Sequence, residues 1–226
     1  MNKWLIVFTV IAIPLIFLAF VFTGCGKVVE EGGTTTTTTS AGGTTTTSVS
    51  GGTTTTYLLI KYPAESCTAI QNDPDTVYNS NVLLLIGWDG MGSNEAFIKF
   101  DVSTLPALTV IKSAILKIYI EAASTSTTNI DFYNLDNNWS QTSLTWNNKP
   151  GITGARIARK TVNLLSDIGT TANIDITPLV QAWVTSSGYA NFGIGIINVD
   201  AATLNLVSIG SGVPASTHKP ILEIRY

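Results

Sequence analysis

The segment Ile111-Lys-Ser-Ala-Ile-Leu-Lys-Ile-Tyr-Ile-Glu121 decides the fold class, because its side chains alternate in character with a period of two. One face of the segment is aliphatic and consists of Ala114, Leu116, Ile118 and Ile120. The opposite face is polar or aromatic and includes Ser113, Lys117, Tyr119 and Glu121. Successive side chains of a β-strand point to opposite faces, so this pattern predicts a strand with one face in a core.

Similar short segments recur on both sides of this strand, separated by loops rich in Gly, Asn, Asp, Ser and Pro. The further predicted strands are Tyr57–Tyr62, Ser66–Ile70, Val82–Gly87, Ala96–Val102, Asn129–Asn134, Arg156–Val162, Asn173–Ile176, Phe192–Asn198, Leu204–Ile209 and Pro220–Tyr226. One short helix is predicted at Thr177–Val184, where Thr and Pro open an apolar stripe. This pattern predicts an all-β domain over residues 57–226, an antiparallel β-sandwich with the helix at one end.

The composition excludes several classes of protein. The 226 residues include 12 Lys and Arg against 15 Asp and Glu, a net charge of −3, whereas a nucleic-acid-binding domain carries a basic surplus. One His and two Cys cannot build a His-rich metal site, a four-cysteine zinc site or a disulfide framework. Only 12% of the residues are charged and 45% are hydrophobic, which favours an exported protein with little catalytic machinery.

The N-terminus is predicted to be an export signal. Residues 4–22 are apolar except for Thr9 and Pro14, and Lys3 supplies the positive flank. The following Phe22-Thr-Gly-Cys25 resembles the lipobox of bacterial lipoproteins, which implies a signal peptide over residues 1–24 and lipid attachment at Cys25. The alternative is an uncleaved transmembrane anchor, since a helix of this length would span roughly 28 Å. Both interpretations place the domain outside the cytoplasmic membrane, on a cell-surface lipoprotein of the outer or cytoplasmic membrane or on a membrane-anchored protein.

Residues 25–56 are predicted to be a disordered linker. The stretch from Gly32 to Thr56 contains 14 Thr, 6 Gly and 3 Ser in 25 positions, and Gly-Gly-Thr-Thr-Thr-Thr occurs three times in it. Such a segment supplies no core side chains and would hold the domain away from a membrane. The alternative is that these threonine strands pair between molecules, because Thr favours extended backbone, which would make the protein a filament or coat subunit.

The order of motifs after the linker resembles the DNRLRE domain, also called carbohydrate-binding module family 96. The motifs run from about Ser66 to the C-terminus: Asp75-Thr-Val-Tyr, Ala96-Phe-Ile-Lys-Phe-Asp-Val-Ser-Thr-Leu-Pro106, Ile111 to Tyr119, Trp139-Ser-Gln-Thr-Ser-Leu-Thr-Trp-Asn-Asn-Lys-Pro150, Ile174 to Trp183, Asn191-Phe-Gly193 and Lys219 to Tyr226. The resemblance implies a jelly-roll-like β-sandwich and binding of polysaccharide, with alginate among the ligands.

The chain departs from this family pattern at two places. Gln141 stands where the family usually has Glu after Trp-Ser, and Ser208-Ile-Gly-Ser-Gly212 replaces the Ser-Arg-Glu segment. The two replacements remove charged groups that could touch a ligand.

Aromatic side chains are the first candidates for a sugar site, because their faces stack on the C–H groups of pyranose rings. Trp139, Trp146 and Trp183 lie in framework motifs and are predicted to pack in the core or under loops. Trp88 lies in the glycine-rich turn 87–94, where we expect an exposed ring, with loop packing as the alternative. Tyr133 and Tyr189 are further candidates on the same reasoning.

Arg156, Arg159 and Lys160 form the densest positive charge of the domain and are candidates for gripping the carboxylates of an acidic polysaccharide. On a regular strand Arg156 and Lys160 would share one face and Arg159 would point to the other. The alternative is an edge strand whose positive charge prevents aggregation.

Asp73 and Asp75 flank a proline and could hold a structural Ca²⁺, with hydrogen bonds within the turn as the alternative. Cys67 is predicted to be a small buried side chain.

The sequence shows no Gly-x-Ser-x-Gly motif, and nothing in it selects a catalytic carboxylate pair. It therefore predicts a non-catalytic, surface-anchored polysaccharide-binding module. The alternative is a structural or adhesive cell-surface subunit that uses the same sandwich for self-association.

Overall fold

The computed structural model describes residues 29–30, 33–40, 44–50, 56–185, 190–199 and 204–226. The predicted signal peptide, the predicted lipidation site Cys25 and the candidate Tyr189 lie outside these residues. Within the described part of the chain, no helix is both long enough and apolar enough to cross a membrane.

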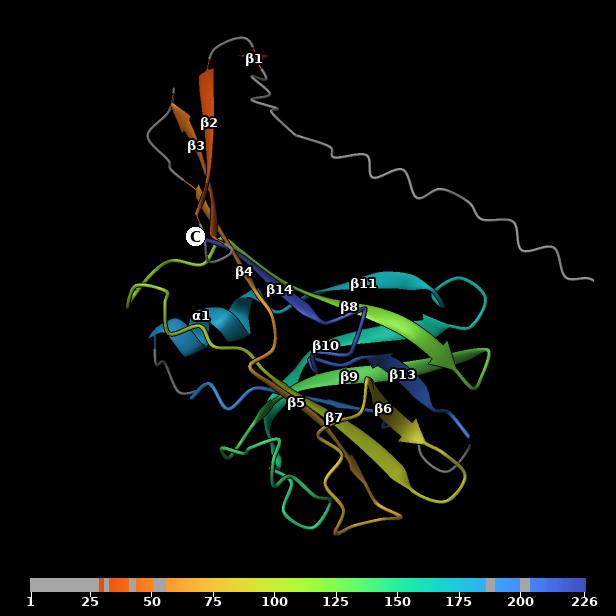
Figure 1. Cartoon of the computed structure of the whole chain (residues 1–226). Helices are drawn as coiled ribbons and strands as arrows, with labels where there is room; N and C mark the ends of the chain where they lie inside the picture. The colour runs from red at the N-terminus through yellow and green to blue at the C-terminus, as the bar shows by residue number, and fades with distance from the viewer. Residues whose placement is uncertain (1–28, 31–32, 41–43, 51–55, 186–189, 200–203) are drawn as a thin grey trace, which may run out of the picture.

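The described residues form fourteen strands and one helix (Figure 1). The strands are β1 (Val29–Glu30), β2 (Gly33–Ser40), β3 (Thr44–Ser50), β4 (Thr56–Lys61), β5 (Glu65–Ile70), β6 (Leu83–Trp88), β7 (Ser93–Lys99), β8 (Ser113–Ala123), β9 (Thr127–Leu135), β10 (Ile152–Asn163), β11 (Thr170–Asp175), β12 (Ile194–Ile197), β13 (Val207–Gly210) and β14 (Ile221–Arg225). The helix α1 covers Thr177–Thr185. Every strand and the helix predicted from residue 57 onward has a counterpart in the structure.

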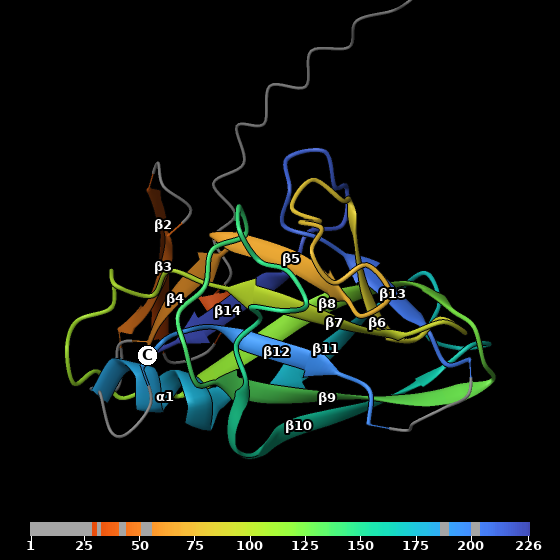
Figure 2. The ribbon, with the colours of Figure 1, turned by 90° about the horizontal axis from the view of Figure 1, so that it is seen from below.

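The strands pair antiparallel in two groups that β6 joins. In the first group β11 pairs with one edge of β8, while β14 and β13 pair with the other edge. β14 continues through β4, β3 and β2 to β1, and β13 continues to β6. The second group runs β5–β7–β12–β9–β10, and β6 contacts it through β7. This curled, sandwich-like arrangement confirms the predicted all-β antiparallel fold (Figure 2).

The main core lies between the inward faces of the two groups. Leu116, Ile118 and Ile120 of β8 are fully buried, as their alternation predicted, and burial of such a side chain contributes about 1.5–3 kcal/mol. Phe100, Ile130 and Phe132 of the second group are also fully buried in this cluster. One face of each central strand is therefore committed to the interior, and the other face is left for surface functions.

Helix α1 closes one end of the strands (Figures 1 and 2). Its buried side chains are Leu179, Val180 and Trp183, and the Trp183 Nε1 donates to Asn134 Oδ1 at 3.2 Å. Asp175 Oδ1 accepts from the backbone N and the hydroxyl of Thr177 at 2.9 and 2.6 Å, which fixes the start of the helix. The prediction of a short helix packed on the core is confirmed.

A second, smaller cluster covers the outer face of β5 and β7. It consists of Cys67, Ala69, Phe97, Leu135, Trp139 and Leu144, with Tyr78, Trp146 and Phe192 packed against it. The segment that follows β9 brings Trp139 and Leu144 onto this face, and Trp139 Nε1 donates to the Phe192 carbonyl at 2.8 Å. Trp139 and Trp183 are buried and Trp146 packs on this cluster, as predicted, and Cys67 has no exposed surface.

The described part of residues 25–56 differs from the expected disordered linker. Residues of β2 pair with β3 from Thr34↔Ser50 to Ser40↔Thr44, and β3 pairs with β4 from Thr44↔Leu59 to Thr47↔Thr56. The physical reason is twofold: Thr is β-branched and favours extended backbone, and the outer edge of β4 offers unpaired backbone groups. The threonine strands therefore extend the first group of strands within the same chain.

Candidate functional site

An open groove of about 760 Å³ lies on the outer face of β14, β8 and β11. Its lining residues are Tyr62, Lys117, Tyr119, Thr171, Asn173, Ser216, Thr217, His218, Lys219 and Ile221. Lys117 and Tyr119 point into it because their neighbours Leu116 and Ile118 point into the core. Strand pairing places Lys117 opposite both Asn173 and Ile221. The floor of the groove is thus set by strand register.

Two aromatic surfaces line this groove. The ring of His218 stacks on the ring of Tyr119, with centroids 3.8 Å apart and planes 22° apart. His218 Nδ1 lies 2.7 Å from Glu121 Oε1, which holds the imidazole in place. Tyr62, just after β4, is 59% exposed and supplies the second ring.

A glycine in the adjacent strand allows the His218 segment to approach so closely. A Cβ at Gly210 of β13 would clash with the backbone oxygen of His218. The segment 216–219 therefore packs directly against the β13 backbone before the chain enters β14. The position of the His218 ring over Tyr119 depends on this contact.

The polar groups of the groove are hydroxyl, amide and amino groups. Lys117 Nζ forms an ion pair with Glu223 Oε1 at 2.6 Å, while Thr171, Asn173, Ser216 and Thr217 add neutral donors and acceptors. Ring faces that alternate with fixed polar groups suit a ligand with both C–H faces and hydroxyl groups.

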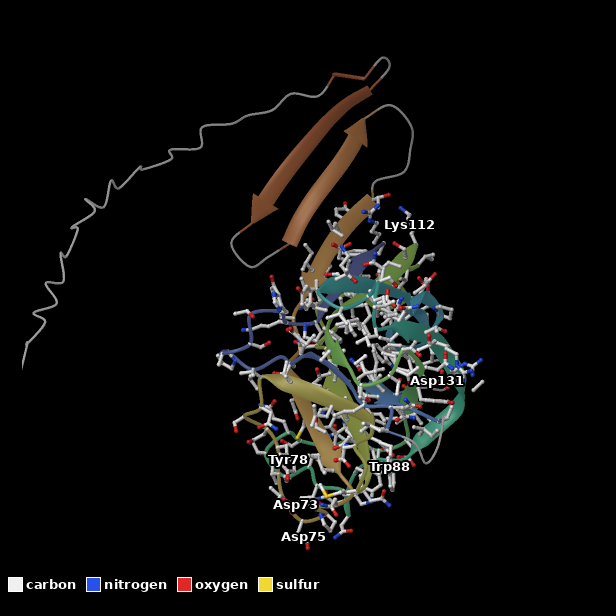
Figure 3. The ribbon with its side chains drawn as sticks, turned by 90° about the vertical axis from the view of Figure 1, so that its right-hand side faces the viewer. Asp73, Asp75, Tyr78, Trp88, Lys112 and Asp131 are labelled. Carbon is white, nitrogen blue, oxygen red and sulfur yellow. The ribbon has the colours of Figure 1, made fainter. Side chains whose placement is uncertain are left out.

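Two of the three predicted cationic residues of β10, Arg156 and Arg159, pair with the buried carboxylate of Asp131, whose position Figure 3 marks. Asp131 has no exposed side-chain surface, and Arg159 donates to both of its oxygens at 2.6 and 2.7 Å. Arg156 Nη1 lies 3.6 Å from the same carboxylate. Hydrogen bonding from Arg159, followed by its charge and that of Arg156, lowers the pKa of Asp131 despite burial, which acts in the opposite direction.

The expectation that Arg156 shares a face with Lys160 is wrong, whereas Arg159 and Lys160 do point to different partners. The β9–β10 register shifts between Thr153 and Ala158, and Gly154 has a φ of 75°. This β-bulge brings Arg156 and Arg159 to one carboxylate, whereas Lys160 turns away and pairs with Asp167 Oδ1 at 3.0 Å.

Tyr133 also lies near the bulge, because it follows Asp131 by two residues on the same strand face. The structure thus gathers Tyr133, Arg156 and Arg159, but separates them from Lys160. Arg156 additionally lines a cavity of about 240 Å³ together with Asn134 and the first residues of α1. That these residues bind ligand stays a prediction.

Trp88 ends β6 and is half-buried, less exposed than its turn suggested. The backbone of Trp88 is paired with Asn205, whose Oδ1 accepts from Trp88 N at 2.7 Å and whose N donates to Trp88 O at 3.0 Å. Figure 3 places Trp88 apart from Asp131. The structure therefore does not unite Trp88 with the other candidates.

Asp73 and Asp75 lie at the end of the domain away from the threonine strands (Figure 3). Asp73 accepts from the Tyr78 hydroxyl at 2.6 Å and the Thr76 hydroxyl at 2.8 Å, and Asp75 accepts from Asn147 Nδ2 at 2.8 Å. The hydrogen bond from Tyr78, followed by that from Thr76, lowers the pKa of Asp73. The hydrogen bond to Asp73 raises the pKa of Tyr78 to about 12. Among the described residues no three His, Cys, Asp or Glu gather around a metal position. Calcium binding here stays a prediction.

The two departures from the family pattern meet at one residue. Ser66 N donates to Gln141 Oε1 at 3.1 Å, and Gly212 N donates to Ser66 Oγ at 2.8 Å. All three line a second groove, of about 620 Å³. Neutral residues thus stand at both places where the family usually has charged ones, and Ser66 joins them through hydrogen bonds between neutral groups.

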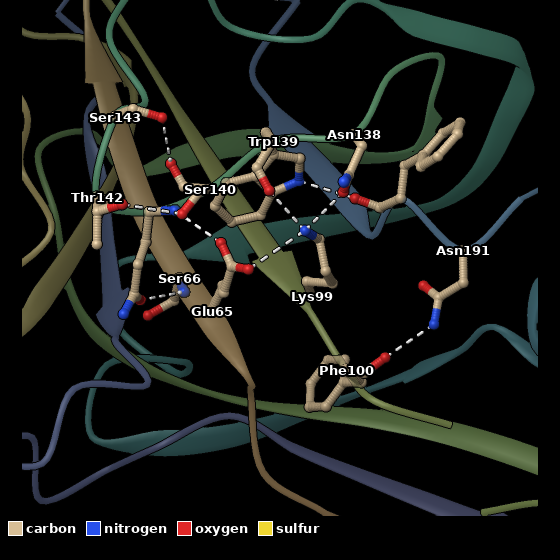
Figure 4. Close-up of polar contacts among 12 residues, drawn as sticks. Glu65, Ser66, Lys99, Phe100, Asn138, Trp139, Ser140, Thr142, Ser143 and Asn191 are labelled. Carbon is tan, nitrogen blue, oxygen red and sulfur yellow. Dashed lines mark hydrogen bonds and ion pairs between the residues drawn. The ribbon is translucent and has the colours of Figure 1, made fainter. Parts of the chain in front are cut away.

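A lysine beside this contact fastens the segment after β9 to the sheet (Figure 4). Lys99 Nζ donates to Trp139 O at 2.6 Å and Asn138 Oδ1 at 3.0 Å, and lies 3.5 Å from Glu65 Oε1. Glu65 Oε2 in turn accepts from Gln141 N at 2.7 Å. These contacts serve the packing of the segment.

Residues 60–226 match the model of carbohydrate-binding module family 96. The chain belongs to this family. The tRNA nuclease WapA of Bacillus subtilis strain 168 is 28% identical over 177 residues, which make up 75% of this chain and 7% of that protein. The tRNA(Glu)-specific nuclease WapA of Bacillus subtilis subsp. natto strain BEST195 matches to the same extent. The chain thus spans only about 7% of the length of these curated relatives.

The aromatic surfaces of the groove in this family 96 module escaped the sequence analysis. Tyr119 was already placed on the solvent face of its strand, which was the one available signal. His218 and Tyr62 gave no such signal, because they reach the groove only through the pairing of β14 with β8 and β4.

Proposed function

We propose that this family 96 module binds polysaccharide, without catalysis, in the groove on the outer face of β8, β11 and β14. The observation that carries the proposal is the stacked Tyr119–His218 pair beside the exposed Tyr62. Open, shallow aromatic surfaces suit the pyranose faces of an extended chain, and surrounding polar groups suit its hydroxyls.

The carboxylates near the groove support a binding role. Glu121 is engaged by His218 at 2.7 Å and Glu223 by Lys117 at 2.6 Å. Both acids hold side chains of the groove in position, which is the role of a binding scaffold. Their partners come from distant parts of the chain, so the groove is organised in advance of ligand.

The setting of the module is part of the same proposal. We propose export by residues 1–24 and anchoring to a membrane through lipid on Cys25, with the domain on the outside of the cell. Individual contacts with a polysaccharide would be weak, and many copies on one membrane would strengthen them by avidity.

Affinity electrophoresis against a panel of neutral and acidic polysaccharides tests the proposal. Tyr62→Ala and Tyr119→Ala should each weaken retention about tenfold, which corresponds to about 1.4 kcal/mol. Trp88→Ala and Tyr133→Ala are the comparison variants outside the groove. The groove proposal expects them to retain native affinity, whereas the prediction from the sequence expects them to lose it. Thermal unfolding checks that each variant is folded. Retention that depends on Trp88 or Tyr133, or no retention on any polymer, would contradict the proposed site.

A second candidate function is that of a structural or adhesive surface subunit, and one observation favours it. Within the described ranges the outer edge of β2 pairs with β1 at Gly33 and Thr34 alone, and the rest of that edge carries neither charge nor proline. Natural edge strands usually carry such features to prevent pairing with another chain. Electron microscopy of cells should show fibres or a lattice with the native protein and neither with Thr36→Pro. Single dispersed particles with the native protein as well as with the variant would reject this function.

A further inference from the structure

We infer that the polysaccharide bound in the groove is uncharged rather than a polyuronate. This inference rests on the proposed function and specifies the ligand class of the same site. It follows from the charge of the domain, the pairing of its cations and the groups that line the groove.

The domain as a whole repels a polyanion. Residues 57–226 contain 10 Lys and Arg against 13 Asp and Glu, a net charge of −3. A protein that collects a polyanion usually presents a positive field that raises the local ligand concentration. The charge of this domain has the opposite sign, so long-range attraction does not help a polyuronate to bind.

Five of the ten cations in residues 57–226 already have a carboxylate partner within 3.5 Å, among them Lys117 in the groove. These pairs are Lys99–Glu65, Lys117–Glu223, Lys149–Glu95, Arg159–Asp131 and Lys160–Asp167. A uronate that bound one of them would have to displace this partner and leave it unpaired. The exchange of one carboxylate for another brings little net free energy, because the gained and lost contacts are alike.

The groove itself is electrically balanced. Lys117 is held by Glu223, and Glu121 stands beside His218 at the other end. Of the two lysines that line the groove, Lys219 is the one for which the described residues supply no carboxylate partner.

The remaining groups of the groove favour hydroxylated, uncharged rings. Tyr62 and the Tyr119–His218 pair are separated by the width of two strands and about two residues along them, which places their backbones about 12 Å apart. Thr171, Asn173 and Ser216 lie among them with neutral donors and acceptors. The groove can therefore hold a run of several neutral sugars. Their rings would stack on the aromatic side chains, and their hydroxyls would form hydrogen bonds with the polar ones.

The cations at the β10 bulge are already committed to a carboxylate of the domain itself. Arg159 is bound to Asp131 through both carboxylate oxygens, and Arg156 faces the same carboxylate at 3.6 Å. Two guanidinium groups share one carboxylate, which leaves a net charge of about one. A polymer with a carboxylate on every sugar needs a row of cations, and β10 does not present one.

Isothermal titration calorimetry on the full chain in detergent tests the inference. The probes are neutral hexasaccharides of β-glucan, cellulose, xylan and mannan, and the anionic hexasaccharides of alginate and polygalacturonate, at about 0.05 and 0.5 M NaCl. We expect a neutral probe to bind at least tenfold more tightly than either anionic probe, with an affinity that changes less than twofold with salt. Tightest binding of a hexauronate, weakened by salt, would overturn the inference but leave the proposed function intact. No binding of any probe would refute both.

Two variants sharpen this test. Glu223→Gln frees Lys117 in the groove and should raise the affinity for the anionic probes severalfold relative to that for the neutral probe. Glu95→Gln is the matched control, because it frees Lys149 outside the groove, and it should leave the affinities for both classes of probe unchanged. An equal gain for the anionic probes in both variants would show that the charge of the groove does not select the ligand and would count against the inference.

Discussion

Removal of the Arg159 guanidinium should destabilise the domain strongly, because it leaves a fully buried carboxylate short of partners. Arg159 donates two hydrogen bonds to Asp131, at 2.6 and 2.7 Å, while Arg156 stays at 3.6 Å. Breaking a buried ion pair on one side costs about 3–5 kcal/mol. The Arg159 side chain is 35% exposed, so the low end applies and Arg159→Leu should cost about 3 kcal/mol.

For a domain of this size that loss lowers Tm by about 6–12 °C. Urea unfolding followed by tryptophan fluorescence at pH 7 measures the free energy directly. Lys160→Leu is the matched control on the same strand: its pair with Asp167 lies nearer the surface and should be worth about 0–1 kcal/mol. Equal losses in the two variants would refute the reasoning.

The pH dependence provides an independent check. The Arg159 hydrogen bonds lower the pKa of Asp131 in the folded state, so the stabilisation is present above the unfolded pKa of about 4. It is lost as the pH falls through the folded pKa, where the carboxylate takes up a proton. The difference in unfolding free energy between native protein and Arg159→Leu should therefore shrink below about pH 4. A difference that is the same at pH 3 and pH 7 would contradict the assignment of the effect to the Asp131 charge.

Three further predictions follow from single contacts. Gly210→Ala should displace the backbone at His218 and cost about 2 kcal/mol or more; chemical denaturation measures the loss, and native stability would refute the clash. Lys99→Met should loosen the segment that Trp139 anchors, which faster hydrogen exchange in residues 136–150 would show and unchanged exchange would contradict. Tyr78 should ionise only near pH 12, so the stability it contributes is present below about pH 10 and lost toward pH 12. Absorbance titration at alkaline pH should lose a component near pH 12 in Tyr78→Phe, and identical titration curves of the two proteins in that range would reject the prediction.

From residue 57 onward the sequence was sufficient for the secondary structure, because each strand there carries its own signal. In β8 the alternation of Leu116, Ile118 and Ile120 with polar residues is a local pattern, and all three side chains are fully buried. The Thr177–Pro178 start of the helix is equally local. Burial of Trp139 and Trp183 followed from their place in framework motifs.

The sequence was insufficient where a local irregularity or a competing partner changed the outcome. The Gly154 bulge reversed the facing of Arg156 relative to Lys160, and strand parity could not foresee it. The threonine segment reads as a linker because it has no core side chains. The open edge of β4, which gives its backbone a partner, exists only after the strands have paired.

By itself, then, the sequence determined that this chain forms an antiparallel β-domain and which faces of its strands are buried, because side-chain alternation acts between neighbours along the chain. Only the tertiary structure decided where a glycan could lie. His218 reaches Glu121 across 97 positions of sequence, and Lys117 reaches Glu223 across 106. The groove is assembled from such distant partners by the pairing of β8 with β11 and β14, and no periodicity within one strand encodes which strands become neighbours.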